Sequence, residues 1–236
     1  MKLFKILLAA ALSVTSFFLS AVEVFNAGRS GWNSRQLKEV FDAELERSRP
    51  DLVVLMVGTN DNLNSHNLIP LPEYRSNLNA MIAAAKKAGA KVLLCEIPNA
   101  CQELMVKRHK DGFFRRESAA EKVKHANEIV AAVAKEQEIP LLETTTVLGE
   151  STLDAASLFR NPANSGAEDG VHPTPTGYFR LADAIAKRIK AENWSPKRIL
   201  CIGDSITFGA AVKGAGTASR DAETYPGRLS RMLNGR

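Results

Sequence analysis

Short apolar runs alternate along the chain with segments whose apolar residues recur at helical spacing. The second, third and fifth runs are almost continuously apolar, as in parallel strands that helices cover on both faces. Glu23 in the first run and Pro140 in the fourth are typical of strands at a sheet edge. This alternation predicts a three-layer α/β/α domain with a parallel sheet. The five expected strands are residues 22–25, 52–57, 91–97, 139–142 and 198–202.

Helices are expected between these strands, where apolar side chains share one face. The stripes cover residues 37–45, 74–85, 123–133 and 181–189. Thr174 followed by Pro175 predicts the start of the last of these helices. Two stretches that follow strands, 98–116 and 143–168, have no clear periodicity. Since loops beyond the carboxyl ends of parallel strands form the ligand site, we expect both to supply its walls.

Composition indicates a globular protein with one domain over residues 22–236. Of the 236 residues, 45% are apolar and 24% are charged, which is ordinary for such a chain. The net charge of +5 falls to +3 if Lys2 and Lys5 are removed with the amino-terminal segment, and it is not gathered in basic runs. A nucleic-acid partner is therefore not expected.

Residues 1–21 have the pattern of a secretory signal peptide. Two lysines precede an uncharged apolar stretch that ends in small residues, and Leu19 and Ala21 would flank the cleavage site. This pattern predicts a secreted or periplasmic protein without stable membrane association after cleavage. The alternative is an uncleaved anchor over residues 6–21, which is slightly short for a membrane span.

The three cysteines do not suggest a disulfide framework. Cys95 and Cys201 lie in predicted strands and are expected to behave as small buried apolar residues. A bridge between Cys95 and Cys101 stays open as an alternative.

Gly203-Asp204-Ser205 follows the last predicted strand directly. A serine at a turn from strand to helix exposes its hydroxyl and leaves its own N–H free to donate to an oxyanion. Taken alone, the tripeptide is equally well explained as a turn with an aspartate cap.

Asp169 and His172 stand three residues apart, just before the Thr174–Pro175 helix start. At that spacing a carboxylate can hold one imidazole nitrogen while the other faces a nucleophile. A structural hydrogen bond is the simplest alternative. A metal site is weaker, because other His and Cys residues do not show ligand spacing.

Two further motifs end the first and second strands. Asn60, in Gly58-Thr-Asn-Asp61, could donate its amide to a developing negative oxygen. Gly31, in the segment 26–31 (NAGRSG), could offer a backbone N–H, with Gly28 as a rival. Both segments are also ordinary turn chemistry. All four motifs nevertheless fall where α/β sites form, and together they supply a nucleophile, a base, a carboxylate and oxyanion donors.

These motifs resemble those of the GDSL, or SGNH, hydrolase family over residues 22–236. The resemblance implies a serine esterase without metal or cofactor, built on a flavodoxin-like five-stranded sheet. Ser205 corresponds to the nucleophile, His172 and Asp169 to the base and acid, and Ser205, Gly31 and Asn60 to the oxyanion hole.

The order of the motifs departs from that of the family, in which the serine comes first. Here Ser205 comes last, and the segment 224–236 resembles the helix that leads into the strand before the glycine. We therefore predict a circular permutation, with the old ends joined through residues 191–198. The flavodoxin-like strand order then places strand 198–202 between strands 22–25 and 52–57.

The family's range leaves the substrate open. Export and the lack of a long apolar loop favour short acyl esters of small molecules or carbohydrates, hydrolysed by a monomer. Arg29, Trp32 and Phe113 are the candidate substrate contacts. The alternatives are a lysophospholipase or thioesterase of the same family and a non-catalytic glycan-binding module. A phosphate-binding loop is a poor fit, because residues 209–216 lack its Gly-Lys-Ser/Thr ending.

Overall fold

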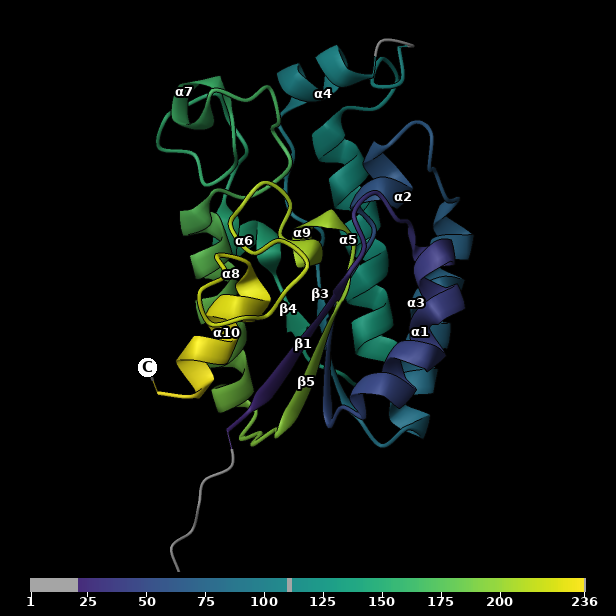
Figure 1. Cartoon of the computed structure of the whole chain (residues 1–236). Coiled ribbons are helices and arrows are strands. Elements are labelled where there is room, and N and C mark those ends of the chain that lie inside the picture. The colour runs from purple at the N-terminus through teal and green to yellow at the C-terminus, as the bar shows by residue number, and fades with distance from the viewer. Residues whose placement is uncertain (1–20, 110–111, 236) are drawn as a thin grey trace, which may run out of the picture.

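A parallel five-stranded sheet forms the centre of the computed structural model, which describes residues 21–109 and 112–235. The strand order is β1-β5-β2-β3-β4, and all four pairings are parallel. Figure 1 shows β5 beside β1 although their colours mark opposite ends of the described chain. The strands are β1 (Glu23–Gly28), β2 (Leu52–Met56), β3 (Lys91–Cys95), β4 (Leu141–Leu142) and β5 (Arg198–Gly203).

The strand order confirms the predicted position of the last strand and of both edges. Leu200 of β5 pairs with Phe25 on one side and with Val53 on the other. β1 and β4, the two runs with edge features, are the outer strands. The predicted bounds differ most at three strands: β1 continues to Gly28 because β5 pairs with it that far, β3 ends at Cys95, and β4 is only the pair Leu141–Leu142.

Helices cover both faces of the sheet, as Figure 1 shows. α1, α3 and α5 pack on one face, and α6, α8 and α10 lie on the other. The helices are α1 (Ser34–Ser48), α2 (Thr59–Leu63), α3 (Leu71–Lys87), α4 (Gln102–Arg108), α5 (Ala119–Glu136), α6 (Thr144–Leu148), α7 (Pro162–Ser165), α8 (Pro175–Ala191), α9 (Ser205–Phe208) and α10 (Tyr225–Leu233). The fold is therefore the predicted α/β class, with three layers.

β5 contributes to both cores through alternate side chains. Leu200 and Ile202 join the core under α1, α3 and α5, whereas Ile199 and Cys201 join the core under α8 and α10. All four side chains are fully buried. Because burial of one such apolar side chain stabilises a fold by about 1.5–3 kcal/mol, β5 is a major part of the packing.

Side-chain caps fix where the main helices begin. Asn33 with Gln36 and Ser118 with Glu121 form capping boxes at the starts of α1 and α5. Thr174 caps α8, and Pro175 is its first residue, as predicted. In their described residues, the two stretches without clear periodicity contain only the short helices α4, α6 and α7.

The end of α10 meets the residue before β1. The Val22 N–H donates to Asn234 Oδ1 at 2.8 Å, and Asn234 Nδ2 donates to the Val22 carbonyl at 3.0 Å. An α10 that led directly into β1, as in the family order, would need this proximity. The permutation itself stays a prediction.

The structure tests the predictions for the cysteines but not the prediction of a signal peptide. Cys95, Cys101 and Cys201 are buried and free, so a Cys95–Cys101 bridge is absent. Burial raises the pKa of the Cys95 thiol. The predicted signal peptide, apart from Ala21, lies outside the described residues. Within the described part of the chain, none of the helices is both long enough and apolar enough to span a membrane.

Candidate active site

Ser205 is the first residue of α9, directly after β5. A Cβ atom on Gly203 would lie 1.9 Å from the Met56 carbonyl oxygen, so only glycine allows β5 to approach β2 this closely. Asp204 then caps α9 by accepting the Ile206 N–H at 3.0 Å. The strand and the cap together fix the position of the Ser205 side chain.

Asp204 also joins the nucleophile turn to α2. Its second carboxylate oxygen accepts the Thr59 N–H at 3.3 Å, and the side chain is fully buried. Burial raises the pKa of Asp204, although the hydrogen bonds from Ile206 and Thr59 act in the opposite direction. The carboxylate thereby holds Ser205 and Asn60, the neighbour of Thr59, in one rigid unit.

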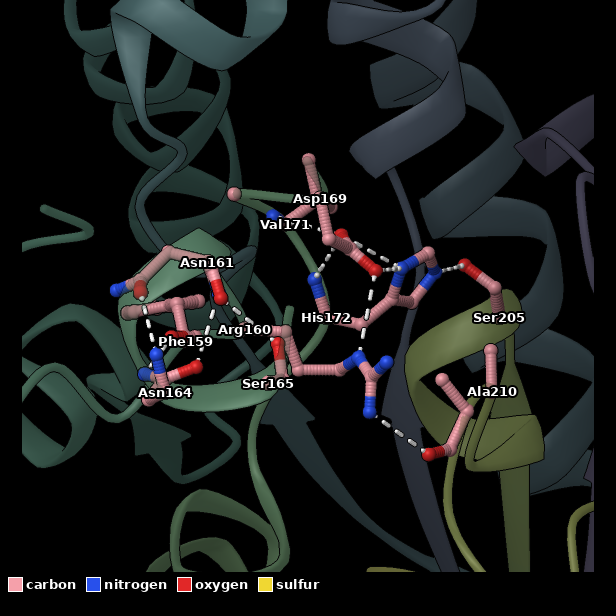
Figure 2. A network of polar contacts seen from close by, with 12 residues as sticks. Phe159, Arg160, Asn161, Asn164, Ser165, Asp169, Val171, His172, Ser205 and Ala210 are labelled. Atoms are coloured by element: carbon pink, nitrogen blue, oxygen red, sulfur yellow. Dashed lines mark hydrogen bonds and ion pairs between the residues drawn. The ribbon is translucent and has the colours of Figure 1, made fainter. Parts of the chain in front are cut away.

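Asp169, His172 and Ser205 form a continuous chain of hydrogen bonds, shown in Figure 2. His172 Nε2 lies 2.9 Å from Ser205 Oγ, and His172 Nδ1 lies 2.9 Å from Asp169 Oδ2 and 3.0 Å from Oδ1. Since a carboxylate only accepts, Nδ1 carries the proton and Nε2 is left to accept the serine hydroxyl. The geometry is that of a nucleophile, a base and an orienting carboxylate.

Asp169 is kept ionised by its hydrogen bonds. Burial by itself would raise its pKa, but the His172 side chain, through its hydrogen bond and charge, outweighs this effect. The N–H groups of His172 and Val171 also donate to Oδ1, at 3.0 and 3.1 Å. The pKa of Asp169 is therefore lowered to about 2.

Two arginines that the sequence interpretation missed flank this carboxylate. Arg160 Nε lies 3.8 Å from Asp169 Oδ2, and its Nη1 donates to the Ala211 carbonyl at 3.1 Å. Arg108 Nη2 donates to the Asp169 main-chain carbonyl at 3.0 Å and lies 3.6 Å from Oδ1. Both residues come from the stretches without periodicity, so the sequence pattern held no signal for their contacts.

The turn that carries His172 is braced by the preceding segment. The Arg160 N–H donates to the His172 carbonyl at 2.9 Å, and the Gly170 N–H donates to the Arg160 carbonyl at 2.8 Å. Gly170 has a φ of 73°, and a Cβ there would lie 2.8 Å from Cys101 Cβ. This turn therefore requires glycine.

Asn60 lines the same pocket as Ser205, whereas Gly31 is not part of the described lining of that pocket. Asn60 Nδ2 donates to the Trp32 carbonyl at 2.9 Å, which fixes the amide and leaves its second N–H uncommitted within the described residues. The N–H groups of Ser205 and Gly31 likewise make no hydrogen bond to described residues. The Gly28 N–H, by contrast, donates to Asn26 Oδ1 at 3.0 Å, which favours Gly31 over its rival.

A pocket of about 260 Å³ opens over Ser205 and His172. Its buried walls include the apolar side chains of Leu63, Met105 and Val171. Carboxylates are absent from the described lining. The lining residues are Thr59, Asn60, Leu63, Asn64, His66, Met105, Arg108, His109, Val171, His172 and Ser205.

Comparison with protein families identifies the family of this chain. The model of the GDSL-like lipase/acylhydrolase family matches residues 5–180. The chain belongs to this family. The match contains Gly31, Asn60, Asp169 and His172 but not β5 or Ser205. The matched range ends before the last strand.

Solved structures of a GDSL-like lipase and of an acetylxylan esterase share the fold. A GDSL-like lipase from Bacteroides thetaiotaomicron is 26% identical, with a TM-score of 0.54, over 69% of this chain and 73% of that one. An acetylxylan esterase from Geobacillus stearothermophilus is 22% identical, with a TM-score of 0.52, over 68% of each chain. Among curated proteins, none matches the chain. Membership of the GDSL-like family makes this chain an ester-hydrolysing enzyme.

The three predicted substrate contacts of this GDSL-like enzyme lie away from the described pocket lining. Arg29 is paired with the buried Glu44 at 2.6 Å and stacks on Trp32. Trp32 contributes its carbonyl to Asn60 rather than its ring to the pocket. Phe113 packs on Phe114 and on His109, which does line the pocket. Substrate contact by these three residues stays a prediction.

The two predicted wall segments differ in outcome. Residues 98–116 supply Met105, Arg108 and His109 to the pocket. Residues 143–168 are not part of its described lining; their Arg160 instead supports the turn with Asp169. His66 and His109 both line the pocket. His109 is buried, with Nδ1 2.9 Å from Ser65 Oγ.

Asp61, next to Asn60, is predicted to make stability depend on pH. Burial, with a contribution from the charge of Asp204, raises its pKa to about 6, although the hydrogen bonds with Ser34 oppose the shift. The pKa of Asp61 in the folded protein thus exceeds its unfolded value of 3.8. Asp61 therefore does not reduce the free energy of unfolding below pH 4, and this free energy falls as pH rises through 6. The loss amounts to about 3 kcal/mol.

Asp61→Asn keeps an oxygen for the Ser34 N–H but removes the ionisation. Urea denaturation should therefore show the variant gaining stability over the wild type between pH 4 and pH 8, by up to about 3 kcal/mol. Asp42→Asn, on the exposed side of α1, is the matched control and should leave the pH profile as it is. If the difference in the free energy of unfolding between Asp61→Asn and the wild type is the same at pH 4 and at pH 8, the raised pKa of Asp61 is contradicted.

Proposed function

We propose that the protein is an exported serine esterase that removes short acyl groups from small-molecule or carbohydrate esters through an acyl-enzyme. Ser205 is the nucleophile, His172 the general base and acid, and Asp169 the residue that orients His172. The single observation that carries the proposal is the 2.9 Å contact of His172 Nε2 with Ser205 Oγ, while His172 Nδ1 is held by Asp169.

Acylation begins when Ser205 Oγ attacks the ester carbonyl carbon and its proton passes to His172 Nε2. The Asp169 carboxylate stabilises the imidazolium that forms. The carbonyl oxygen becomes an oxyanion, which accepts from the N–H groups of Ser205 and Gly31 and from the Asn60 amide; each such donor is typically worth about 3 kcal/mol. The intermediate collapses, the carbon–oxygen bond to the alcohol breaks, and the alcohol leaves with the proton from His172.

Deacylation repeats these steps with water. His172 Nε2 takes a proton from the water molecule, whose oxygen attacks the acyl carbon. The oxyanion again forms in the same hole. Ser205 then leaves as the bond to the acyl carbon breaks, and it recovers its proton from His172. The net products are a carboxylic acid and an alcohol.

The pocket supports a short acyl group. Its volume of about 260 Å³ is small for a ligand site, and its apolar part is limited to three side chains, Leu63, Met105 and Val171. A long fatty acyl chain would have to extend beyond it. A lysophospholipase or long-chain thioesterase is therefore the less favoured reading within the family.

The proposal includes export, on the evidence of residues 1–21. After cleavage the esterase would act as a monomer in the periplasm or outside the cell.

The test is covalent labelling with a serine-reactive phosphonate, followed by peptide mass spectrometry. We expect an adduct at Ser205 in the wild type, because only an activated serine attacks phosphorus at a useful rate. His172→Ala should lose the adduct, since the base that activates Ser205 is gone. Ser219→Ala, which changes an exposed serine, should be labelled like the wild type.

The same experiment separates the hydrolase from a glycan-binding module on this fold. Absence of a Ser205 adduct in the wild type, together with no turnover of a chromogenic acetate ester, would overturn the hydrolase assignment. An intact adduct in His172→Ala would overturn the role of His172 alone.

A further inference from the structure

Arg108 gives the pocket a fixed positive charge that the proposed hydrolysis does not use. It is the last residue of α4 and lines the pocket together with Ser205 and His172. Its side chain is 39% exposed, whereas Leu63, Met105 and Val171 are at most 4% exposed. The apolar side chains therefore form the floor, and the guanidinium lies at the mouth.

Among the described residues, the acids near Arg108 leave its positive charge only partly balanced. Asp169 is shared by Arg108, Arg160 and His172, so one carboxylate faces two guanidinium groups. Glu168, the next acid along the chain, is paired with Lys107 at 2.7 Å. Asp204 is buried behind Ser205 and is engaged by the N–H groups of Thr59 and Ile206.

The geometry of Arg108 leaves hydrogen-bond donors for a ligand. A guanidinium carries five N–H donors, and within the described structure Arg108 uses one, from Nη2 to the Asp169 carbonyl. This contact and the 3.6 Å approach of Nη2 to Asp169 Oδ1 hold the group beside the pocket. A planar, anchored guanidinium is well suited to bind a carboxylate through two parallel hydrogen bonds.

We propose that Arg108 determines specificity by binding a carboxylate in the alcohol part of the substrate ester. The acyl group would occupy the apolar floor, and the alcohol, at the mouth, would place its carboxylate against Arg108. The substrate class is then a short acyl ester of a hydroxy acid or an acidic sugar. This inference rests on the proposed function, because attack by Ser205 on the ester is what places the acyl group in the pocket and the alcohol part at its mouth.

The test compares 4-acetoxybenzoate with 4-acetoxybenzamide, which have similar shapes but differ in charge. Arg108→Gln should lower the ratio of kcat/KM for the acid to that for the amide by at least about tenfold, mainly through KM, because a charge-assisted pair is lost. Arg108→Lys should restore part of the ratio. Lys107→Gln, on the same helix but outside the described pocket lining, should leave the ratio unchanged.

A purely structural role of Arg108 predicts a different result. If Arg108 only braced the turn with Asp169, Arg108→Gln would reduce turnover of both esters alike, and the unchanged ratio would overturn the proposal. The ratio also cancels the intrinsic reactivity of the two leaving groups, since each variant is compared with the wild type.

Equilibrium binding separates this proposal from the hydrolase assignment. Calorimetry of wild-type protein should show 4-hydroxybenzoate binding more tightly than 4-hydroxybenzamide, with the preference lost in Arg108→Gln. This readout needs no turnover, so it can support Arg108 even where the wild type lacks a Ser205 adduct. Equal or absent binding of the two products by the wild type would overturn the role of Arg108 and leave the hydrolase assignment to the labelling result.

Discussion

Ser205→Ala is expected to lower kcat for a chromogenic acetate ester by about 10⁵-fold, with little change in KM. The substitution removes the attacking oxygen, which lies 2.9 Å from His172 Nε2, but leaves the pocket and the oxyanion donors in place. Steady-state kinetics over a range of enzyme concentrations would measure the residual rate. Far-ultraviolet circular dichroism would check that the fold is retained.

The double variant Ser205→Ala/His172→Ala makes this prediction sharper. Because the two residues act as one unit, the second substitution should cost almost nothing after the first. Ser219→Ala is the control for removal of a serine hydroxyl elsewhere and should keep wild-type kcat. If kcat of Ser205→Ala is within tenfold of the wild-type value, Ser205 is not the nucleophile.

The sheet could be predicted because its signals are local. Continuous apolar runs marked β2, β3 and β5 as interior strands, and Glu23 and Pro140 marked the edges. The position of β5 between β1 and β2 could not be predicted from a local pattern, because β5 is more than a hundred residues from either partner along the chain. The order of the four motifs, compared with that of the GDSL family, supplied it.

The outer parts of the site were much less predictable. Ser205, His172 and Asp169 lie in short motifs at defined places, and the structure brings these three together. Arg108 and Arg160 reach Asp169 from segments that lack periodicity, so their positions depend on packing of the whole fold.

Arg29 was predicted as a substrate contact, but the structure gives it a different partner. It follows β1 beside the motif with Gly31, which made it a natural candidate for the substrate. Its guanidinium is instead occupied by Glu44, a buried carboxylate on α1 that requires a cation. The sequence could not reveal this pairing, because the partner lies on a different element.

A chain that ends at Lys197 is expected not to form the native structure. It would lack β5, whose side chains from Ile199 to Ile202 are fully buried and shared by both cores. Their loss removes roughly 6–12 kcal/mol of burial, which is comparable to the whole stability of an ordinary domain. We expect no cooperative urea transition and no native near-ultraviolet circular dichroism.

The reason is topological as well as energetic. Without β5, β1 and β2 lose the strand to which both are paired, so β1 has no neighbour left in the described sheet. Full-length Ser205→Ala is the control, because it is equally inactive but should unfold cooperatively. A truncated chain with a native-like transition would show that residues 22–197 fold alone, and β5 would then be an addition to the sheet rather than an essential interior strand. In the intact protein β1 should gain amide protection only when β5 does, since pairing across so long a separation forms late in folding.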